Sequence, residues 1–153
     1  MKMLSEMLEL AVEAHDGQVD KAGVPYIFHI MAVTEYTRQR WGHEDEELLC
    51  IAAGHDLLED TDVTWQFLYE NFGYRVANGI LDLSKVGAAT NSYGKYQNNV
   101  LSSTDAMKVK LCDLRHNMLE SRIIMDAKTE RRMLKYRAFR DLIEEVLNEA
   151  GVS

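Results

Sequence analysis

The segment AAGHDLLEDT brings one imidazole and three carboxylates close together. His55 and Asp56 are followed, three to five residues along the chain, by Glu59 and Asp60. Residues three and four apart share a face of an α-helix, so these side chains are predicted to crowd one side of a helix, or its edge. Carboxylates that close repel one another, and burial strengthens the repulsion. A divalent cation would turn this repulsive group into a binding site.

A solvated acidic face is the alternative interpretation of this segment, and the segment alone leaves it open. The flanking residues are apolar, however, because LLCIAA precedes the pair and Leu57 and Leu58 lie inside the segment. The helix is therefore predicted to be largely buried. Buried carboxylates are costly unless they are paired or bound to a metal.

Further ligands for a cation occur in two other segments of the chain. His29 ends the string PYIFH, and Asp113 lies in KLCDLRHN. With His55 and Asp56 they make a set of two imidazoles and two carboxylates that contains no thiolate. Mixed nitrogen and oxygen ligands suit Mn²⁺, Fe²⁺ or Zn²⁺ in a hydrolytic site better than a structural zinc. Four protein ligands would leave coordination positions for water and a substrate oxygen.

The elements that position these residues are predicted to be helices. Apolar residues recur at helical spacing, and strict two-residue alternation is almost absent. The expected fold is all-α, a single compact bundle of six or seven helices in one domain over residues 1–153. The predicted helices cover about 3–15, 25–41, 45–58, 64–73, 74–84, 104–120 and 127–149. The Gly-, Asn- and Ser-rich stretch 85–99 predicts a loop, or a short helix between loops.

Composition narrows the class of protein. The 153 residues carry a net charge of −8 and are 46% hydrophobic, as expected of a soluble globule rather than a nucleic-acid-binding surface. Two isolated cysteines favour a reducing compartment. No signal peptide and no membrane-spanning run is visible. We expect a cytoplasmic monomer or small homo-oligomer that acts on a small molecule, with neither a membrane nor a nucleic-acid polymer as partner.

Four strings, taken in order, resemble one known family. They are AxxAHxGQ (11–18), KxGxPYIxH (21–29), HDxxEDT (55–61) and KLxDxxHNM (110–118). His29, then His55 with Asp56, then Asp113 is similar to the metal pattern of the HD phosphohydrolase superfamily. The four strings together resemble the hydrolase domain of the RelA/SpoT proteins and the stand-alone small alarmone hydrolases. The resemblance covers about residues 11 to 118.

The resemblance implies a fold, a metal and an activity. The fold would be an all-helical HD domain that holds a divalent ion, Mn²⁺ above all, through the four ligands already named. The activity would be removal of pyrophosphate from the 3′ position of guanosine tetra- or pentaphosphate. Glu59 and Asp60 would be the catalytic acids, the first steering the proton of the attacking water. Lys21 and Asn117 would face the nucleotide. On physical grounds, Lys21 and Arg115 are candidates to stabilise the negative charge that builds up on the phosphate.

The chain also departs from the family pattern. Asp20 precedes Lys21 where the family usually has a basic pair, whose arginine commonly stacks on guanine. The arginine of the family's DRLHN string is displaced by one position, to Arg115. These differences keep a second hypothesis open, the same chemistry on another nucleotide such as NADPH or a nucleoside polyphosphate. A non-catalytic nucleotide-sensing module is the third, although a pure binder would not need Glu59 and Asp60.

Three further residues lie near the predicted site in the sequence. His116 adjoins the Asp113 segment, and a structural role has more weight for it than a direct one. Tyr93 and Tyr96 are predicted to lie in the polar loop, where they could cover a nucleotide.

Overall fold

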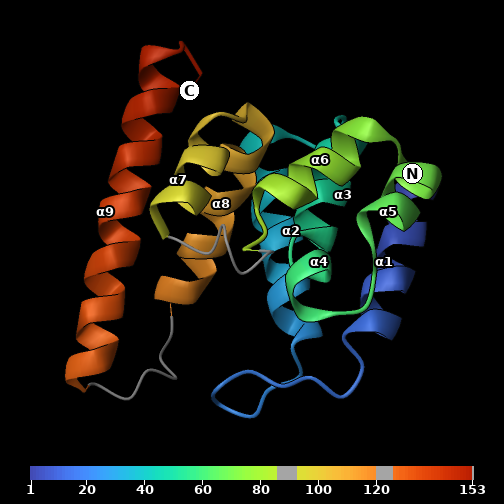
Figure 1. Ribbon diagram of the computed structural model, residues 1–153, viewed down its shortest axis with the longest axis horizontal. Coiled ribbons are helices and arrows are strands. Elements are labelled where there is room, and N and C mark those ends of the chain that lie inside the picture. Colours follow the sequence, from blue (N-terminus) through green and yellow to red (C-terminus); the bar gives the residue numbers. More distant parts are fainter. Residues whose placement is uncertain (86–92, 120–125, 153) are drawn as a thin grey trace.

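The computed structural model describes residues 1–85, 93–119 and 126–152, and these fold into a bundle of helices (Figure 1). The helices are α1 (Lys2–Ala14), α2 (Ile27–Trp41), α3 (Glu46–Gly54), α4 (Leu57–Asp60), α5 (Trp65–Phe72), α6 (Tyr74–Asp82), α7 (Tyr93–Leu101), α8 (Thr104–Met118) and α9 (Ala127–Glu149). Within the described ranges, extended pairing is limited to an isolated bridge between Val19 and Pro25. The predicted all-α class is confirmed.

Side-chain caps fix several helix starts close to their predicted positions. Thr64 accepts a hydrogen bond from the Phe67 amide and caps α5, as predicted. Asp45 caps α3 in the same way, by accepting from the Leu48 amide. Helix α2 begins at Ile27 rather than at Pro25. Pro25 instead belongs to the bridge that closes the loop before α2.

The predicted helix 45–58 is interrupted at the His-Asp pair, which corrects its boundary. Helix α3 ends at Gly54, and α4 is a separate single turn that begins at Leu57. Asp56, between them, has φ −103° and ψ 1°, outside the helical range. The ring of His55 bonds the Ala52 carbonyl at 2.8 Å, which satisfies an acceptor that the end of α3 leaves without a backbone partner. His55, Asp56, Glu59 and Asp60 therefore do not lie on one continuous helix.

Part of the stretch 85–99, for which a loop or a short helix between loops was predicted, is helical. Residues from Tyr93 onward form α7, so the short-helix alternative holds for 93–101, and 86–92 lie outside the described residues. Tyr96 and Val100, one turn apart, are both buried. The Tyr96 ring packs edge-on against Phe139 of α9, with centroids 6.2 Å apart. Tyr93 and Tyr96 are thus helical residues rather than the loop residues that were expected.

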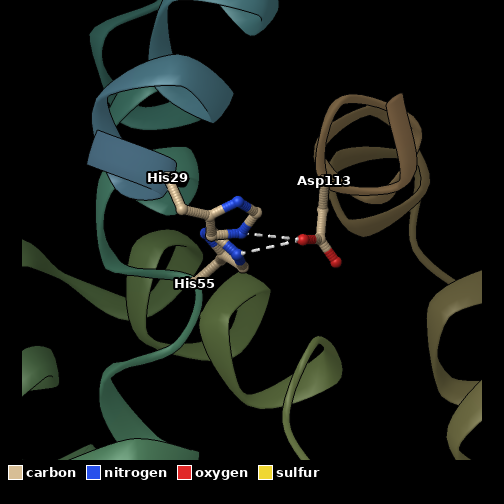
Figure 2. A group of neighbouring side chains, drawn as sticks. All are labelled: His29, His55 and Asp113. Atoms are coloured by element: carbon tan, nitrogen blue, oxygen red, sulfur yellow. Dashed lines mark ion pairs between the residues drawn. The ribbon is translucent and has the colours of Figure 1, made fainter. Parts of the chain in front are cut away.

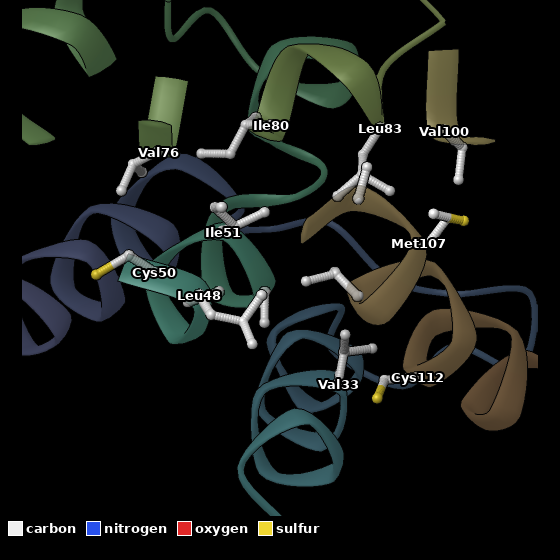
Figure 3. Packing of buried hydrophobic residues seen from close by; sticks show 14 of the residues in the cluster. Val33, Leu48, Cys50, Ile51, Val76, Ile80, Leu83, Val100, Met107 and Cys112 are labelled. Carbon is white, nitrogen blue, oxygen red and sulfur yellow. The ribbon is translucent and has the colours of Figure 1, made fainter. Parts of the chain in front are cut away.

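Helix α3 lies at the centre of the bundle and explains the apolar run before the His-Asp pair. Residues 48–54 are all buried, and α3 packs against α1, α2, α6 and α8. Figure 3 shows Ile51 of α3 beside Ile80 of α6, with Val33 of α2 near Cys112 of α8. Cys50 and Cys112 are both buried free thiols, as their apolar surroundings predicted. No helix in the described part of the chain is both long and apolar enough to cross a membrane.

The close approach of α6 to α3 at Gly79 gives a stability prediction. A Cβ at Gly79 would lie 2.5 Å from Cδ1 and 2.9 Å from Cγ1 of Ile51. Overpacking of this kind costs about 1–3 kcal/mol, which exceeds the ~1 kcal/mol that alanine gains over glycine in a helix. Gly79→Ala should therefore lower the free energy of unfolding by up to about 2 kcal/mol, measured by denaturant titration.

The matched control for this prediction is Gly94→Ala in α7. A Cβ at Gly94 meets no atom within 4 Å, so this variant should be as stable as the parent or slightly more stable. Equal stability of the two alanine variants would contradict the tight packing of α6 on α3.

Candidate metal centre

Three buried ligands from distant parts of the chain meet between α2, α3 and α8. They are His29 on α2, His55 directly after α3, and Asp113 on α8, and one ligand atom from each lies within 4.8 Å of the others. Asp113 Oδ1 is 3.0 Å from His29 Nε2 and 3.6 Å from His55 Nε2. Figure 2 shows both imidazoles pointing at this one carboxylate oxygen. The three helices pack against one another, and this packing brings together ligands that lie far apart in the sequence.

Asp56 adds a second carboxylate to the cluster. Its Oδ2 lies 2.9 Å from His55 Nε2 and 3.9 Å from His29 Nε2. The hydroxyl of Tyr26 donates a hydrogen bond to the same oxygen at 2.5 Å and so holds the carboxylate in place. All four residues predicted as metal ligands are therefore brought together.

The hydrogen bonding of His55 supports a cation rather than a purely structural cluster. Its Nδ1 donates to the Ala52 carbonyl, so in the neutral ring Nε2 carries a lone pair. This Nε2 is fully buried and forms no hydrogen bond in the described part of the chain, although it faces oxygens of Asp56 and Asp113. A lone pair and two carboxylates that face one another need a positive charge between them. The donor set fits a divalent ion, because imidazole nitrogen and carboxylate oxygen are both common ligands.

The shifted pKa values of His55 and Asp113 also show that the cluster favours a positive charge. Burial lowers the pKa of His55, but Asp56 and Asp113 outweigh it and leave that pKa well above the usual range. Burial raises the pKa of Asp113, but Lys110 and the two histidines outweigh it and hold that pKa well below the usual range. The two carboxylates therefore favour the protonated form of His55. A cation must compete with that proton, since metal binding requires the neutral imidazole.

Two residues of α8 hold Asp113 in place: Lys110 contacts the oxygen that does not face the histidines, and Asn117 contacts the oxygen that does. Lys110 Nζ lies 2.7 Å from Oδ2, and the Asn117 side chain donates to Oδ1 at 3.1 Å. The Lys110 side chain is only 12% exposed, and its Nζ also lies 5.3 Å from the centroid of the Tyr96 ring. Asn117 also borders the hollow above the cluster, and its contact with a nucleotide stays a prediction.

His116 contacts a metal-ligand candidate, which agrees with the structural role favoured for it. Its Nδ1 lies 2.7 Å from Nδ1 of His29, so one ring donates to the other. If His29 donates, its Nε2 presents a lone pair to Asp113 and the cluster. His116 follows Asp113 by three residues, so both lie on one face of α8. That spacing was the signal that could have identified it.

A hollow of about 170 Å³ lies above the cluster and is bordered by acids, cations and phenol rings. Its acidic border includes Glu59 and Asp60, the predicted catalytic residues. Glu59 Oε1 accepts a hydrogen bond from the Lys85 amide at 2.7 Å, which fixes the carboxylate at the rim. The Lys85 ammonium lies 5.0 Å from the centroid of the Tyr96 ring. The hollow therefore presents carboxylates and ammonium groups next to the metal cluster.

Lys21 and Arg115 do not line this hollow. Lys21 is exposed in the loop between α1 and α2. The slight burial of its ammonium group, followed by the nearby charges of Arg132 and Lys128, lowers its pKa. Arg115 lies over Tyr36, 3.8 Å from the ring centroid, and borders a different hollow. The reason for its position is helix geometry: two residues correspond to about 200° of rotation, so Arg115 and Asp113 point to opposite sides of α8.

Asp60 gives a pH-dependent stability prediction. Burial, followed by repulsion from Asp56 and Glu59, raises the pKa of Asp60 to about 6. Because this folded-state pKa exceeds the ordinary value near 4, the contribution of Asp60 to stability is present below about pH 4 and is lost as the pH rises through 6. Asp60→Asn should therefore raise the melting temperature of metal-free protein by about 2 °C at pH 7.5 and by less at pH 4.5.

The measurement is a pair of thermal melts in EDTA, with the exposed Asp62→Asn as a charge-matched control. Equal shifts for Asp60→Asn at the two pH values would show that repulsion within the acidic group does not set its stability.

Comparison with known proteins gives relatives by sequence, although no protein-family model matches the chain. It is 36% identical over 118 residues to the guanosine-3′,5′-bis(diphosphate) 3′-pyrophosphohydrolase of Haemophilus influenzae, covering 71% of this chain and 17% of that protein. It is 31% identical over 127 residues to the bifunctional (p)ppGpp synthase/hydrolase SpoT of Escherichia coli, covering 77% and 18%. The match to the Spiroplasma citri pyrophosphohydrolase is 30% over 168 residues, covering 99% and 21%. The chain thus spans about a fifth of the length of these curated relatives.

The fold also has a solved counterpart. A structure described as a metazoan ortholog of SpoT that hydrolyses ppGpp and plays a role in starvation responses matches with a TM-score of 0.75. The match covers 100% of this chain and 98% of that chain at 18% sequence identity, so it shows a shared fold. With the sequence matches, it confirms the resemblance that the motifs predicted: the chain is an HD-type relative of the RelA/SpoT hydrolases.

Proposed function

We propose that the chain is a metal-dependent nucleotide pyrophosphohydrolase that removes pyrophosphate from the 3′ position of guanosine tetra- or pentaphosphate. The observation that carries this proposal is the buried cluster of His29, His55 and Asp113, which opens to a hollow bordered by Glu59 and Asp60. The substrate class is supported by the curated relatives, which are named as 3′-pyrophosphohydrolases of this nucleotide.

The metal would be held by His29, His55, Asp56 and Asp113. Mn²⁺ is the proposed ion, and the ligand set also suits Fe²⁺ and Zn²⁺. A divalent ion bound there would supply Lewis-acid chemistry, lowering the pKa of water and offsetting charge on phosphate oxygens. Lys110 and Asn117 keep Asp113 ionised and oriented for this task.

The acid–base work falls to Glu59 and Asp60. Glu59 would take the proton from the water that attacks the phosphorus of the 3′ diphosphate, held in position by its bond to the Lys85 amide. The P–O bond to the 3′ oxygen then breaks, and that oxygen receives a proton from Asp60. A pKa near 6 allows Asp60 to carry this proton close to neutral pH. The Lys85 ammonium would stabilise the phosphate charge that builds up during attack.

A second substrate, another nucleotide such as NADPH or a nucleoside polyphosphate, is favoured by the loop before α2. Asp20 Oδ1 accepts hydrogen bonds from the amides of Ala22 and Val24, at 2.9 and 3.0 Å, so its carboxylate shapes this turn. A carboxylate with that role cannot replace the arginine that commonly stacks on guanine in the family. The geometry thus supports the hydrolytic chemistry more firmly than selection of guanine.

The test is pyrophosphate release from guanosine tetraphosphate with added Mn²⁺, with Asp56→Ala alongside. Release by the parent alone is the expected result, and it would establish the substrate and the metal site together. Release from another nucleotide of a panel, without release from guanosine tetraphosphate, would replace the substrate but keep the chemistry. Metal binding with no turnover of any nucleotide would favour the sensing module. The single domain over 1–153, the oligomeric state and the cytoplasmic location stay predictions.

A further inference from the structure

A second hollow, larger than the one at the metal cluster, lies between α2, α8 and α9. Its volume is about 350 Å³, against about 170 Å³ for the first. The α8 residues that border it point away from those that border the metal hollow, so α8 separates the two. Its lining is mostly apolar near Leu111, Cys112 and Met118, and its rim carries Arg40, Arg115 and Arg140.

The rim is positively charged on a chain whose net charge is −8. Glu144 is the carboxylate among the lining residues, and Arg40 binds it through two hydrogen bonds of 2.8 and 2.9 Å. The charge of that pair cancels, which leaves Arg115 and Arg140. Arg140 also pairs with Asp141, which lies outside the lining, so Arg115 is the rim cation without an ion-pair partner in the described part of the chain, and its charge attracts anions to this hollow.

The two remaining arginines keep donors for a ligand. In the described part of the chain, Arg115 contacts the Tyr36 ring and forms no ion pair. Arg140 bonds Asp141 through Nε alone, at 3.0 Å, so its terminal nitrogens keep their N–H groups. Guanidinium groups bind the oxygens of phosphate-like groups through paired hydrogen bonds. The hollow thus joins an anion-binding rim to an apolar interior.

We propose that this hollow is a second binding site, for a small organic anion with a flat apolar body and a phosphate-like head. The body would enter between Tyr36 and the apolar lining, and the head would meet Arg115 and Arg140. Small-molecule sites commonly combine such an apolar cavity with a few placed polar groups. This binding site does not depend on the proposed hydrolysis.

The site is also connected to the metal cluster. The ring centroid of Tyr36 lies 6.2 Å from that of His116, and His116 Nδ1 lies 2.7 Å from Nδ1 of His29. A ligand that displaces Tyr36 is therefore linked to a metal-ligand imidazole through one residue, His116. Such coupling is reciprocal, so an occupant that changes the affinity for metal is itself bound differently when metal is present. This second part of the inference rests on the proposed metal site.

The probe for the experiment is 1-anilinonaphthalene-8-sulfonate, a flat apolar body with an anionic head. Fluorescence titration of the full chain should show one site, and Arg115→Ala combined with Arg140→Ala should weaken binding on the order of tenfold or more. Arg137→Ala is the matched control, because it removes one exposed arginine of α9 outside the hollow and should not change binding. The neutral analogue N-phenyl-1-naphthylamine should bind the parent more weakly than the sulfonate.

Equal binding of the sulfonate by parent and double variant, both folded by circular dichroism, would overturn the site. Equally tight binding of the neutral analogue by the parent would overturn the anionic chemistry of the ligand. The coupling is tested by calorimetric Mn²⁺ titration with and without saturating probe. A shift of Mn²⁺ affinity in the parent that disappears in the double variant is expected, and an unchanged affinity would reject the coupling. Failure of nucleotide hydrolysis would leave the probe-binding result unaffected.

Discussion

Asp113→Ala is expected to abolish metal binding and to destabilise the fold, two effects that can be measured separately. The variant removes a carboxylate that faces both His29 and His55, so the remaining ligands lose charge and geometry. It also leaves the buried ammonium of Lys110 without its partner at 2.7 Å. Breaking one side of a buried ion pair costs about 3–5 kcal/mol. Loss of the metal should lower turnover on the order of 10³-fold or more, because the cation no longer stabilises the transition state. Each 1.4 kcal/mol of lost transition-state stabilisation lowers the rate tenfold.

A double variant separates the two effects. Asp113→Ala with Lys110→Met removes the unpaired charge and should recover most of the lost unfolding free energy, because both partners of the buried pair are then apolar. It should not recover metal binding. The parent should gain about 2.7 kcal/mol of stability at an Mn²⁺ concentration a hundredfold above its dissociation constant, and neither variant should gain any.

The measurements are denaturant titrations with Mn²⁺ and with EDTA, and Asp62→Ala is the exposed carboxylate control. An Mn²⁺-dependent gain in the double variant equal to that of the parent would exclude Asp113 as a ligand. Failure of Lys110→Met to restore stability would show that the ion pair is not the cause of the destabilisation.

Glu59→Gln is expected to remove most turnover while leaving the metal in place. Glutamine keeps the oxygen that accepts from the Lys85 amide at 2.7 Å, so the shape of the rim is conserved. What it loses is the ability to take a proton, and general-base catalysis typically contributes about 10²–10⁴-fold. The fall should appear in kcat, with little change in KM and in Mn²⁺ affinity.

The control for this variant is Glu70→Gln, which makes the same chemical change on an exposed face of α5 away from the hollow. Full turnover by Glu59→Gln would exclude Glu59 as the base, even if the metal site and the substrate prove correct. A loss of Mn²⁺ affinity equal to the loss of turnover would assign Glu59 to the metal instead.

The local chemistry of this protein was determined by the sequence. Helical periodicity and Thr64 as a cap are properties of neighbouring residues, and both were confirmed. The His55-Asp56 pair, with Glu59 and Asp60 about a turn later, was predicted to belong to a functional site. The reason is that several carboxylates within an apolar run need a counter-charge. The two remaining ligands were identified by residue type and by resemblance to a family pattern. All four lie together in the fold, and their role as metal ligands stays a prediction.

The surroundings of the ligands were decided by tertiary structure alone. His116 becomes a partner of His29 only because α8 packs beside α2. Lys110 and Asp113 are three residues apart on α8, so tertiary structure decided the burial of their pair rather than the pairing itself. The break between α3 and α4 turns Asp56 toward His55, which a continuous helix would have prevented. Lys21 and Arg115, assigned to the substrate by position in a motif, lie outside the hollow. A motif fixes residue types and spacing, whereas the side of a helix that faces a site depends on the packing of distant segments.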